Sequence, residues 1–266
     1  MNDCLVLIPA RLAASRLPGK PLADIAGLPM IIRVWQQAMA SGAARVAIAT
    51  DSSEIAEVVR QHGGEAVMTR PDHPSGSDRI EEAAGLLDPA AEHDIIINLQ
   101  GDLPEIDPAM LPVLVAGLAA SGADLATPVA PASASEALLP QVVKAVVAWP
   151  QSTAIRNGSH GRALYFSRHP VPLNYGRSAT EDAGGHTTGL TPPGHWHHIG
   201  IYAWRRAALE RFVHLPPSPL EQAEKLEQLR ALEAGMRIEA VAVDKAPGGI
   251  DTPEDLAAVR ARFGNP

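Results

Sequence analysis

Short apolar runs alternate with segments of helical spacing through the first 120 residues of the chain. The apolar runs cover Leu5–Ile8, Arg45–Thr50, Ala66–Thr69 and Asp94–Gln100. The segments with helical spacing or helix-start signals cover Met30–Ala40, Ile55–Gln61 and Asp107–Ala120. Such alternation is typical of strand–helix units that build a parallel sheet with helices on both faces. The sequence therefore predicts an α/β fold with a doubly wound, mostly parallel sheet.

The pattern changes from about Asp124, where short β-like pieces follow one another. These pieces are Leu125–Val129, Val142–Trp149 and Ala163–Ser167. We expect an inserted small β region at about 124–200, used for dimerisation, within a single domain that spans residues 1–266. Pro170–Trp196 has no apolar periodicity and is rich in Gly and Pro, and so long a structureless stretch is usually a functional lid or disordered.

Composition and charge exclude several classes of protein. With 46% hydrophobic and 20% charged residues, the chain resembles ordinary globular proteins. The formal net charge of −8 argues against a nucleic-acid partner, because duplex binding needs a basic face. No apolar run approaches the roughly 20 residues that span a bilayer. Met1-Asn2-Asp3 lacks the basic start of a signal peptide, and the single Cys4 excludes an internal disulfide, so we expect a cytoplasmic protein.

A basic loop follows the first apolar run, which ends at Pro9. It carries Arg11, Arg16 and Lys20, and no acidic residue precedes Asp24. A buried strand that leads into a cationic loop rich in Gly and Pro can hold a polyphosphate at the carboxyl edge of a sheet. Arginine offers a planar fork to phosphate oxygens, while lysine offers a mobile point charge. The alternative is a solvated basic loop.

The amino-acid sequence of this loop is unusual. Pro9–Leu22 reads P-A-R-x-x-x-S-R-L-P-G-K-P-L, which resembles the signature of the 3-deoxy-manno-octulosonate cytidylyltransferases, the CMP-Kdo synthetases. Further motifs resemble the same family in order along the chain: Ser75–Arg79, Gln100–Asp102, Ala163–Arg168, His198–Tyr202, Ser218–Arg230 and Gly248–Asp255. The resemblance covers nearly the whole chain. It implies a Rossmann-like nucleotidyltransferase that joins CTP to 3-deoxy-manno-octulosonate, an acidic eight-carbon sugar, for lipopolysaccharide synthesis, and that forms a homodimer.

The resemblance also implies a nucleotide site. Arg11, Arg16 and Lys20 would hold the triphosphate, with Arg11 and Lys20 taking part in catalysis, and the Ser75–Arg79 turn would lie against the cytosine base. The complete implied set is Pro9, Ala10, Arg11, Ser15, Arg16, Lys20, Ser75, Gly76, Ser77, Arg79 and Gln100. From its residues alone, the Ser75–Arg79 turn would equally serve as a plain helix cap.

Two carboxylates are candidates for a magnesium site. Asp102 follows Gly101 at the end of an apolar run, where the glycine allows a sharp turn. Thr252 predicts a helix cap, which leaves Asp251 unexplained. The resemblance implies that Asp102 and Asp251 bind Mg²⁺ and are catalytic. Leu103 stands where the family more often has an acidic residue, which puts a catalytic role for that acid in doubt.

The resemblance places the sugar at Arg168, His198, Tyr202, Glu224 and Gln228. An arginine at a strand end can grip a sugar carboxylate in two places. Glu224 and Gln228 would share one face of a single helix over Glu221–Ala234. The alternatives are a surface ion pair for Arg168 and a solvated polar stripe for the helix.

Two other functions stay open from the sequence. The acceptor could be a related acidic sugar, such as amino-Kdo or a sialic-type acid, or the chain could be a catalytically dead sugar-nucleotide sensor. Pro170–Trp196 lies between Arg168 and His198, so we expect it to close over bound sugar. His195, His197 and His198 do not predict a zinc site, because alternation along a strand places His198 on the opposite face from the other two.

Overall fold

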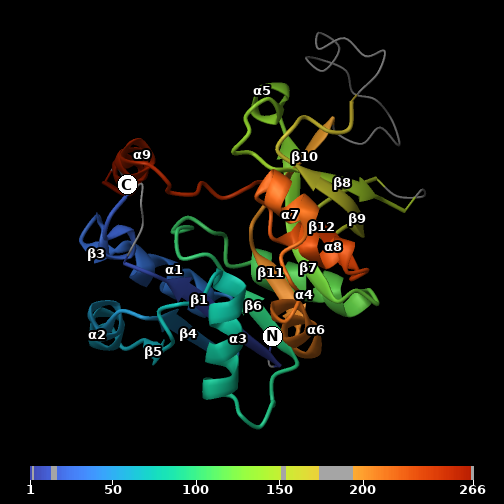
Figure 1. The fold of residues 1–266 in the computed structure, drawn as a ribbon. Coiled ribbons are helices and arrows are strands. Elements are labelled where there is room, and N and C mark those ends of the chain that lie inside the picture. The colour runs from blue at the N-terminus through green and yellow to red at the C-terminus, as the bar shows by residue number, and fades with distance from the viewer. Residues whose placement is uncertain (2, 13–16, 151–153, 174–193, 265–266) are drawn as a thin grey trace. The chain divides into compact units, whose positions relative to one another are not determined.

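The computed structural model describes residues 1, 3–12, 17–150, 154–173 and 194–264. The chain divides into two compact units (Figure 1). Unit 1 comprises Met1–Pro112, Ala203–Val213 and Pro247–Pro266, and unit 2 comprises Val113–Tyr202 and His214–Ala246. The predicted β region at about 124–200 falls within unit 2. Ser15, Arg16 and most of Pro170–Trp196 lie outside the described residues.

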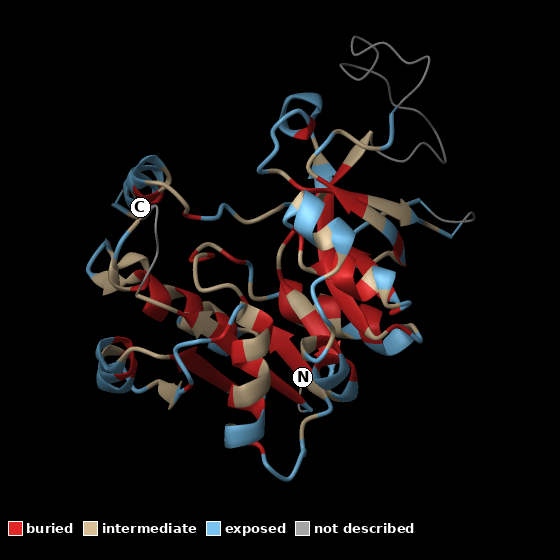
Figure 2. Cartoon of the chain, in the orientation of Figure 1, coloured by how far each residue is buried: buried red, intermediate tan, exposed pale blue. Residues whose placement is uncertain are grey.

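Unit 1 is built on a mostly parallel sheet. Its strands are β1 (Cys4–Ala10), β4 (Arg45–Thr50), β5 (Glu65–Met68), β6 (Ile95–Asn98) and β11 (Tyr202–Arg205), in the order β11-β6-β1-β4-β5. Strand β1 pairs in parallel with β4 and with β6, and β4 pairs in parallel with β5. The apolar residues of β1 are almost fully buried, as its position between two strands requires (Figure 2). The predicted α/β fold with a mostly parallel sheet is confirmed.

Three helices of unit 1 begin at a hydroxyl side chain that caps their first turn, namely Ser52, Ser75 and Thr252. The helices of this unit are α1 (Met30–Ala40), α2 (Ser53–Gln61), α3 (Gly76–Leu87), α6 (Arg206–Val213) and α9 (Pro253–Gly264). The cap of α2 is Ser52 and not Asp51, although an aspartate at the end of a strand is also a good helix cap. The hydroxyl of Ser52 accepts a hydrogen bond from the Ile55 amide, while the Asp51 carboxylate accepts one from Arg79, which is remote in sequence.

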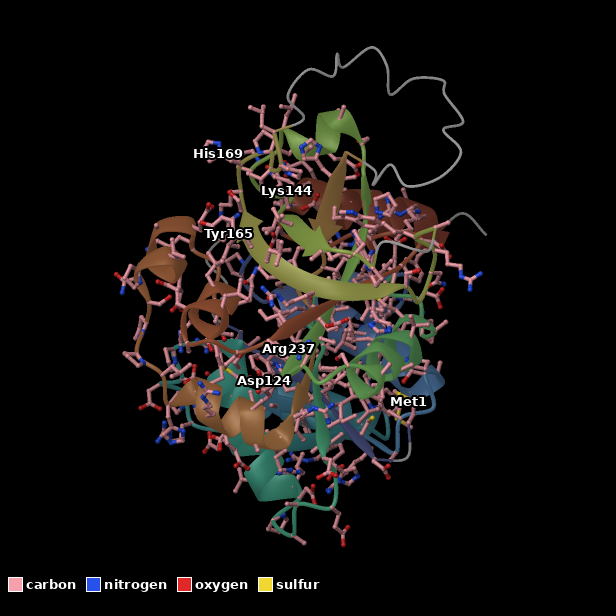
Figure 3. All side chains as sticks on the ribbon, turned by 90° about the vertical axis from the view of Figure 1, so that its right-hand side faces the viewer. Met1, Asp124, Lys144, Tyr165, His169 and Arg237 are labelled. Atoms are coloured by element: carbon pink, nitrogen blue, oxygen red, sulfur yellow. The ribbon has the colours of Figure 1, made fainter. Side chains whose placement is uncertain are left out.

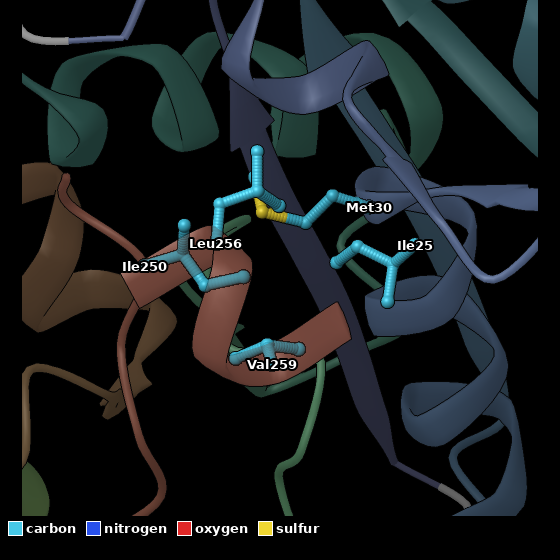
Figure 4. Packing of buried hydrophobic residues seen from close by; sticks show 5 residues of the cluster. All are labelled: Ile25, Met30, Ile250, Leu256 and Val259. Atoms are coloured by element: carbon cyan, nitrogen blue, oxygen red, sulfur yellow. The ribbon is translucent and has the colours of Figure 1, made fainter. Parts of the chain in front are cut away.

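A small apolar cluster anchors the C-terminal segment to the start of unit 1. Ile250 and the α9 residues Leu256 and Val259 pack against Ile25 and Met30 (Figure 4). Ile25 lies in the short hairpin of β2 (Asp24–Ile25) and β3 (Leu28–Pro29), which follows the 3₁₀ turn η1 (Lys20–Leu22). The cluster therefore holds the segment that contains Asp251 beside the segment that contains Lys20.

Unit 2 holds a second group of strands, mostly antiparallel. They are β7 (Leu125–Ala132), β8 (Lys144–Ala148), β9 (His160–Ser167), β10 (His195–His198) and β12 (Ile238–Ala242). Within unit 2 their order is β10-β8-β9-β12-β7, and β10 also pairs with β7. Strands β7 and β12 are parallel and begin where the Arg237 amide donates to the Asp124 carboxylate at 2.7 Å (Figure 3). The remaining helices are α4 (Met110–Ala120), α5 (Ala134–Ala137), α7 (Pro219–Glu224) and α8 (Gln228–Glu233).

The predicted single helix over Glu221–Ala234 was wrong. The structure breaks it at Lys225, which adopts a left-handed conformation with φ 55° and ψ 46°. The break exposes the backbone carbonyls of Glu224 and Lys225, and both accept hydrogen bonds from the Arg168 guanidinium. Helical periodicity does not register such a long-range contact, so the local pattern overestimated the length of the helix.

Candidate active site

A pocket of about 170 Å³ opens at the carboxyl edge of the unit 1 sheet. Parallel strands end at the same edge, and ligands of α/β proteins bind there. The pocket is lined by residues from the segments that follow β1 and β6: Pro9, Ala10, Arg11, Lys20, Pro21, Met30, Gln100, Gly101 and Asp102. Glycine suits this place, because a Cβ on Gly101 would lie 3.1 Å from the Pro9 carbonyl oxygen and 3.2 Å from Ile31, both of them tight contacts. The structure thus brings six residues of the predicted nucleotide and metal sets to one pocket, namely Pro9, Ala10, Arg11, Lys20, Gln100 and Asp102.

Both predicted metal ligands converge on the Lys20 ammonium. Its Nζ donates to Asp102 Oδ2 at 2.7 Å and to Asp251 Oδ1 at 3.3 Å. A backbone hydrogen bond from the Ile250 amide to the Asp102 carbonyl, 3.1 Å long, ties the two segments together. The Lys20 side chain is only 14% exposed, whereas those of Asp102 and Asp251 are 31% and 50% exposed. The two carboxylates therefore face one cation and remain open to solvent.

The start of α9 fixes the backbone of Asp251. The Asp255 carboxylate accepts hydrogen bonds from the amides of Asp251 and Thr252, while the Thr252 hydroxyl accepts one from the Asp255 amide. Burial alone would raise the pKa of Asp255, but these hydrogen bonds outweigh it and hold that pKa below its ordinary value. The predicted Thr252 cap is confirmed. Asp255 serves the cap, which leaves the Asp251 carboxylate to face Lys20.

The donor set fits magnesium. Two carboxylates already face one positive charge, with the Lys20 ammonium standing where a cation would be attracted. Among the described residues, no group of three or more His, Cys, Asp or Glu side chains could hold a metal ion. Magnesium does not need such a cage, because it commonly binds one or two carboxylates and completes its coordination with water and substrate phosphate oxygens.

Arg11 joins the pocket to the turn that begins α3. Its Nη2 donates to the carbonyl oxygens of His73, at 2.6 Å, and Ser75, at 3.2 Å. The buried His73 ring bonds the Glu82 carboxylate, which also accepts from the Arg70 amide. Sequence reasoning missed His73, and only its position in the Arg70–Arg79 stretch could have drawn attention to it.

The turn itself forms a helix cap. The Ser75 hydroxyl accepts from the amides of Ser77 and Asp78, as the alternative interpretation of this turn required. A Cβ on Gly76 would lie 3.4 Å from Pro9, which places the turn against the end of β1. The cap and a place beside the nucleotide are therefore compatible.

Two members of the predicted nucleotide set are buried in unit 1. Arg79 is fully buried, and its guanidinium donates to Thr69 Oγ1 at 2.5 Å and to Asp51 Oδ2 at 3.1 Å. Burial lowers the pKa of Arg79, and Asp51 offsets only part of that effect. Ser77 is 3% exposed. These two side chains hold the turn from within and do not line the pocket.

Gln100 is oriented by a residue that the sequence did not single out. Its amide nitrogen donates to the side-chain oxygen Oδ1 of Asn98 at 3.2 Å, and Asn98 is 2% exposed. The signal that could have found Asn98 is an amide within an otherwise apolar strand, because a buried polar side chain needs a hydrogen-bond partner. Asn98 thus supports the pocket wall from behind.

In unit 2, Arg168 and Glu224 are linked directly. The Glu224 carboxylate accepts from the Ser167 hydroxyl at 2.7 Å and from the Arg168 amide at 3.0 Å. Burial alone would raise the pKa of Glu224, but these hydrogen bonds hold it below its ordinary value. The Arg168 guanidinium donates to the backbone carbonyls of Pro140, Glu224 and Lys225, so it is not the surface ion pair considered above.

The other predicted sugar residues meet around a buried histidine. His198 is 6% exposed, with Nε2 3.0 Å from Thr127 Oγ1 and Nδ1 3.5 Å from Gln228 Nε2. The Phe166 ring meets it edge-on at 4.8 Å between centroids, and the Tyr202 ring lies at 5.7 Å. Burial lowers the pKa of His198 to about 3, so this imidazole is neutral at physiological pH. Burial also raises the pKa of Tyr202.

Two findings concern the zinc site and the membrane span that the sequence argued against. Along β10, His195 and His197 are half-buried while Trp196 and His198 are buried, which is the predicted alternation of faces. Across the part of the chain that the structure describes, no helix is both long and apolar enough to cross a membrane.

Comparison with known proteins shows which family the chain matches. The family described as Cytidylyltransferase matches residues 5–238. A 3-deoxy-manno-octulosonate cytidylyltransferase of Bradyrhizobium sp. (strain ORS 278) is 54% identical over 97% of this chain and 96% of its own length. The enzyme of that name from Rhodopseudomonas palustris (strain BisB5) is 53% identical over 98% and 97%. A solved CMP:2-keto-3-deoxy-manno-octonic acid synthetase complexed with CTP is 41% identical, with a TM-score of 0.84 and 98% of each chain covered.

Proposed function

Since the chain belongs to the 3-deoxy-manno-octulosonate cytidylyltransferase family, we propose that it joins the cytidylyl group of CTP to 3-deoxy-manno-octulosonate. The products are CMP-Kdo and pyrophosphate. The observation that carries the proposal is the convergence of Lys20, Asp102 and Asp251 beside the pocket, in a chain with a close structural likeness to a CTP complex.

The reaction requires little covalent participation by the protein. The anomeric hydroxyl of the sugar attacks the α-phosphorus of CTP, the bond from that phosphorus to the bridging oxygen breaks, and pyrophosphate leaves with the electron pair. Catalysis of such a transfer rests on positioning and on neutralising negative charge. No dedicated general base is assigned among the described residues.

We propose that unit 1 holds the nucleotide. Arg11, Arg16 and Lys20 would bind the triphosphate, and the carbonyl contacts of Arg11 with His73 and Ser75 orient its guanidinium. Pro9, Ala10, Gly76 and Gln100 would lie along the base, with Ser77 and Arg79 supporting the turn from within. Asp102 and Asp251 would hold Mg²⁺. A magnesium ion bound there supplies charge neutralisation and lowers the pKa of the attacking hydroxyl.

We propose that unit 2 supplies the side chains that bind the sugar, namely Arg168, His198, Tyr202, Glu224 and Gln228. The contacts of Arg168 with the carbonyls of Pro140 and Lys225 are solvent-exposed, so its guanidinium can exchange them for the sugar carboxylate. The carboxylate of Glu224 anchors the strand end that carries this arginine.

The proposal also includes a homodimer that uses the β region of unit 2. Leucines there are unusually exposed for a folded chain: Leu138 at 70%, Leu139 at 42% and Leu164 at 45%. Covering exposed leucines against a second copy of the chain would remove their side chains from water, which favours association. Light scattering is expected to give about twice the 28.0 kDa mass of one chain, and a monomeric mass at micromolar concentration would rule the homodimer out.

The function is tested by following both products. With CTP, Mg²⁺ and 3-deoxy-manno-octulosonate present, pyrophosphate and CMP-Kdo are expected in equal amounts. Omitting either substrate should stop the release of pyrophosphate. Pyrophosphate released without the sugar would show a CTP hydrolase, and this would contradict the proposed transfer.

A further inference from the structure

The Thr127 hydroxyl has three partners in the interior of unit 2. Its Oγ1 lies 3.0 Å from the Ile199 carbonyl oxygen, 2.9 Å from the Ile201 carbonyl oxygen and 3.0 Å from His198 Nε2. Thr127 is fully buried in β7, and strand pairing places Val129 of β7 opposite His198 of β10. The same pairing brings the hydroxyl to the histidine.

Counting hydrogen atoms fixes the direction of these bonds. A threonine hydroxyl has one hydrogen to donate and two lone pairs that accept. Both isoleucine carbonyls can only accept, so the hydroxyl hydrogen is directed to them. The contact with His198 is then satisfied when Nε2 carries a hydrogen and donates it to Thr127 Oγ1. If Nε2 lacked a hydrogen, the hydroxyl would have to turn away from two buried carbonyls.

The hydrogen on Nε2 determines whether Nδ1 donates or accepts a hydrogen bond. Burial keeps the His198 imidazole neutral, so with a hydrogen on Nε2 its Nδ1 has a bare lone pair. The amide nitrogen of Gln228, which is 4% exposed, lies 3.5 Å from that lone pair. An amide nitrogen donates, so the Gln228 amide is oriented with its nitrogen toward His198. Its oxygen then remains as an acceptor on the opposite side of the amide group.

We infer that Thr127 is a positioning residue, which sets the hydrogen-bond polarity of the sugar site through His198 and Gln228. Along this chain the Gln228 amide, the His198 ring and the Thr127 hydroxyl each direct one hydrogen inward, and the last one points to the isoleucine carbonyls. At the Gln228 amide oxygen the site consequently presents an acceptor, which selects a sugar group that donates a hydrogen bond there, such as a hydroxyl. This inference rests on the proposed function and on the placement of the sugar at His198 and Gln228.

The tautomer can be read directly from the protein without any turnover. In long-range ¹H–¹⁵N spectra near neutral pH, His198 is expected to show a directly bonded hydrogen on Nε2 and none on Nδ1. Its signals are assigned among the ten histidines by their loss in His198→Gln. A hydrogen on Nδ1, or a doubly protonated ring, would overturn the inference whatever the enzyme assay shows.

Kinetics of two variants tests the link to the sugar. Thr127→Val replaces the hydroxyl by a methyl group of similar size, and is expected to raise KM for the sugar about tenfold, because a buried hydrogen-bonding group loses its partner. The KM for CTP should stay within about twofold of the original, since the change removes no nucleotide contact. Thr127→Ser keeps the hydroxyl and should restore both the sugar KM and the Nε2 signal.

A matched control is Thr50→Val, which changes another fully buried threonine, in β4 of unit 1, whose hydroxyl accepts a hydrogen bond from the Ser52 amide. The His198 signals should not move in that variant. If Thr127→Val lost the Nε2 signal but kept the sugar KM, Thr127 would not act on the sugar site and the inference would fall. If the unaltered protein showed no transfer from CTP at all, the proposed function would fail, while the spectra would still decide the tautomer.

Discussion

Replacing Asp102 by asparagine is expected to lower kcat roughly a thousandfold, which is the scale of losing a group that stabilises charge in the transition state. The variant keeps the shape of the side chain and removes its negative charge. Asp251→Asn should show a similar loss, because both carboxylates face the cation position now held by the Lys20 ammonium. The measurement is kcat at saturating CTP and sugar across a range of Mg²⁺ concentrations.

The fold should survive either change. Both carboxylates are partly exposed, and ion pairs of that kind contribute about 1 kcal/mol or less to the free energy of unfolding. Asp72→Asn is the matched control, since Asp72 is 74% exposed and pairs only loosely with Arg70 at 3.3 Å. It should leave kcat unchanged. If Asp102→Asn retained near-original kcat at saturating Mg²⁺, Asp102 could not be a metal ligand.

The second large effect is discrimination between nucleotides. We expect kcat/KM for CTP to exceed that for UTP by roughly a hundredfold or more, because a site built for one pattern of donors and acceptors leaves buried groups unpaired with the other. Cytosine offers an amino donor where uracil offers a carbonyl acceptor. The polar groups beside the pocket are held in fixed orientations, with Gln100 bonded to Asn98 and the Ser75 hydroxyl committed to its helix cap.

The measurement is kcat/KM for each nucleotide under identical Mg²⁺ and sugar concentrations. ATP serves as a control for binding through the triphosphate alone, since any nucleotide can use Arg11 and Lys20. Equal efficiency with CTP and UTP would show that the turn and Gln100 do not read the base.

Local patterns predicted the parallel sheet well and the long-range contacts poorly. The limits of α1 and β4 agree with the prediction, because apolar periodicity and flanking Gly and Pro residues determine them locally. The break at Lys225 was missed because it depends on Arg168, more than fifty residues away. Thr127 gave no signal at all, since a threonine in an apolar strand is ordinary and only strand pairing brings it to His198.

The residues of the candidate site were likewise predicted from local signals, whereas most of the contacts between them were not. Strand-end positions identified Asp102, and capping left Asp251 unexplained, but neither observation alone predicted that they meet. The resemblance to the family supplied that pairing, and the apolar packing of Ile250 on Met30 provides its physical reason. Arg79 was assigned to the nucleotide from its motif, whereas its full burial is a tertiary property that the motif does not contain.

Competition among acidic sugars for one pool of CTP tests the proposed transfer to 3-deoxy-manno-octulosonate. Purified protein, CTP and Mg²⁺ are mixed with equal concentrations of 3-deoxy-manno-octulosonate, its 8-amino analogue and N-acetylneuraminate, and the CMP-linked products are separated and weighed by mass spectrometry. CMP-Kdo is expected to form first and to predominate, matched by an equal amount of pyrophosphate. A predominant CMP conjugate of either other sugar, or the absence of any conjugate, would contradict transfer to 3-deoxy-manno-octulosonate as the activity of this protein.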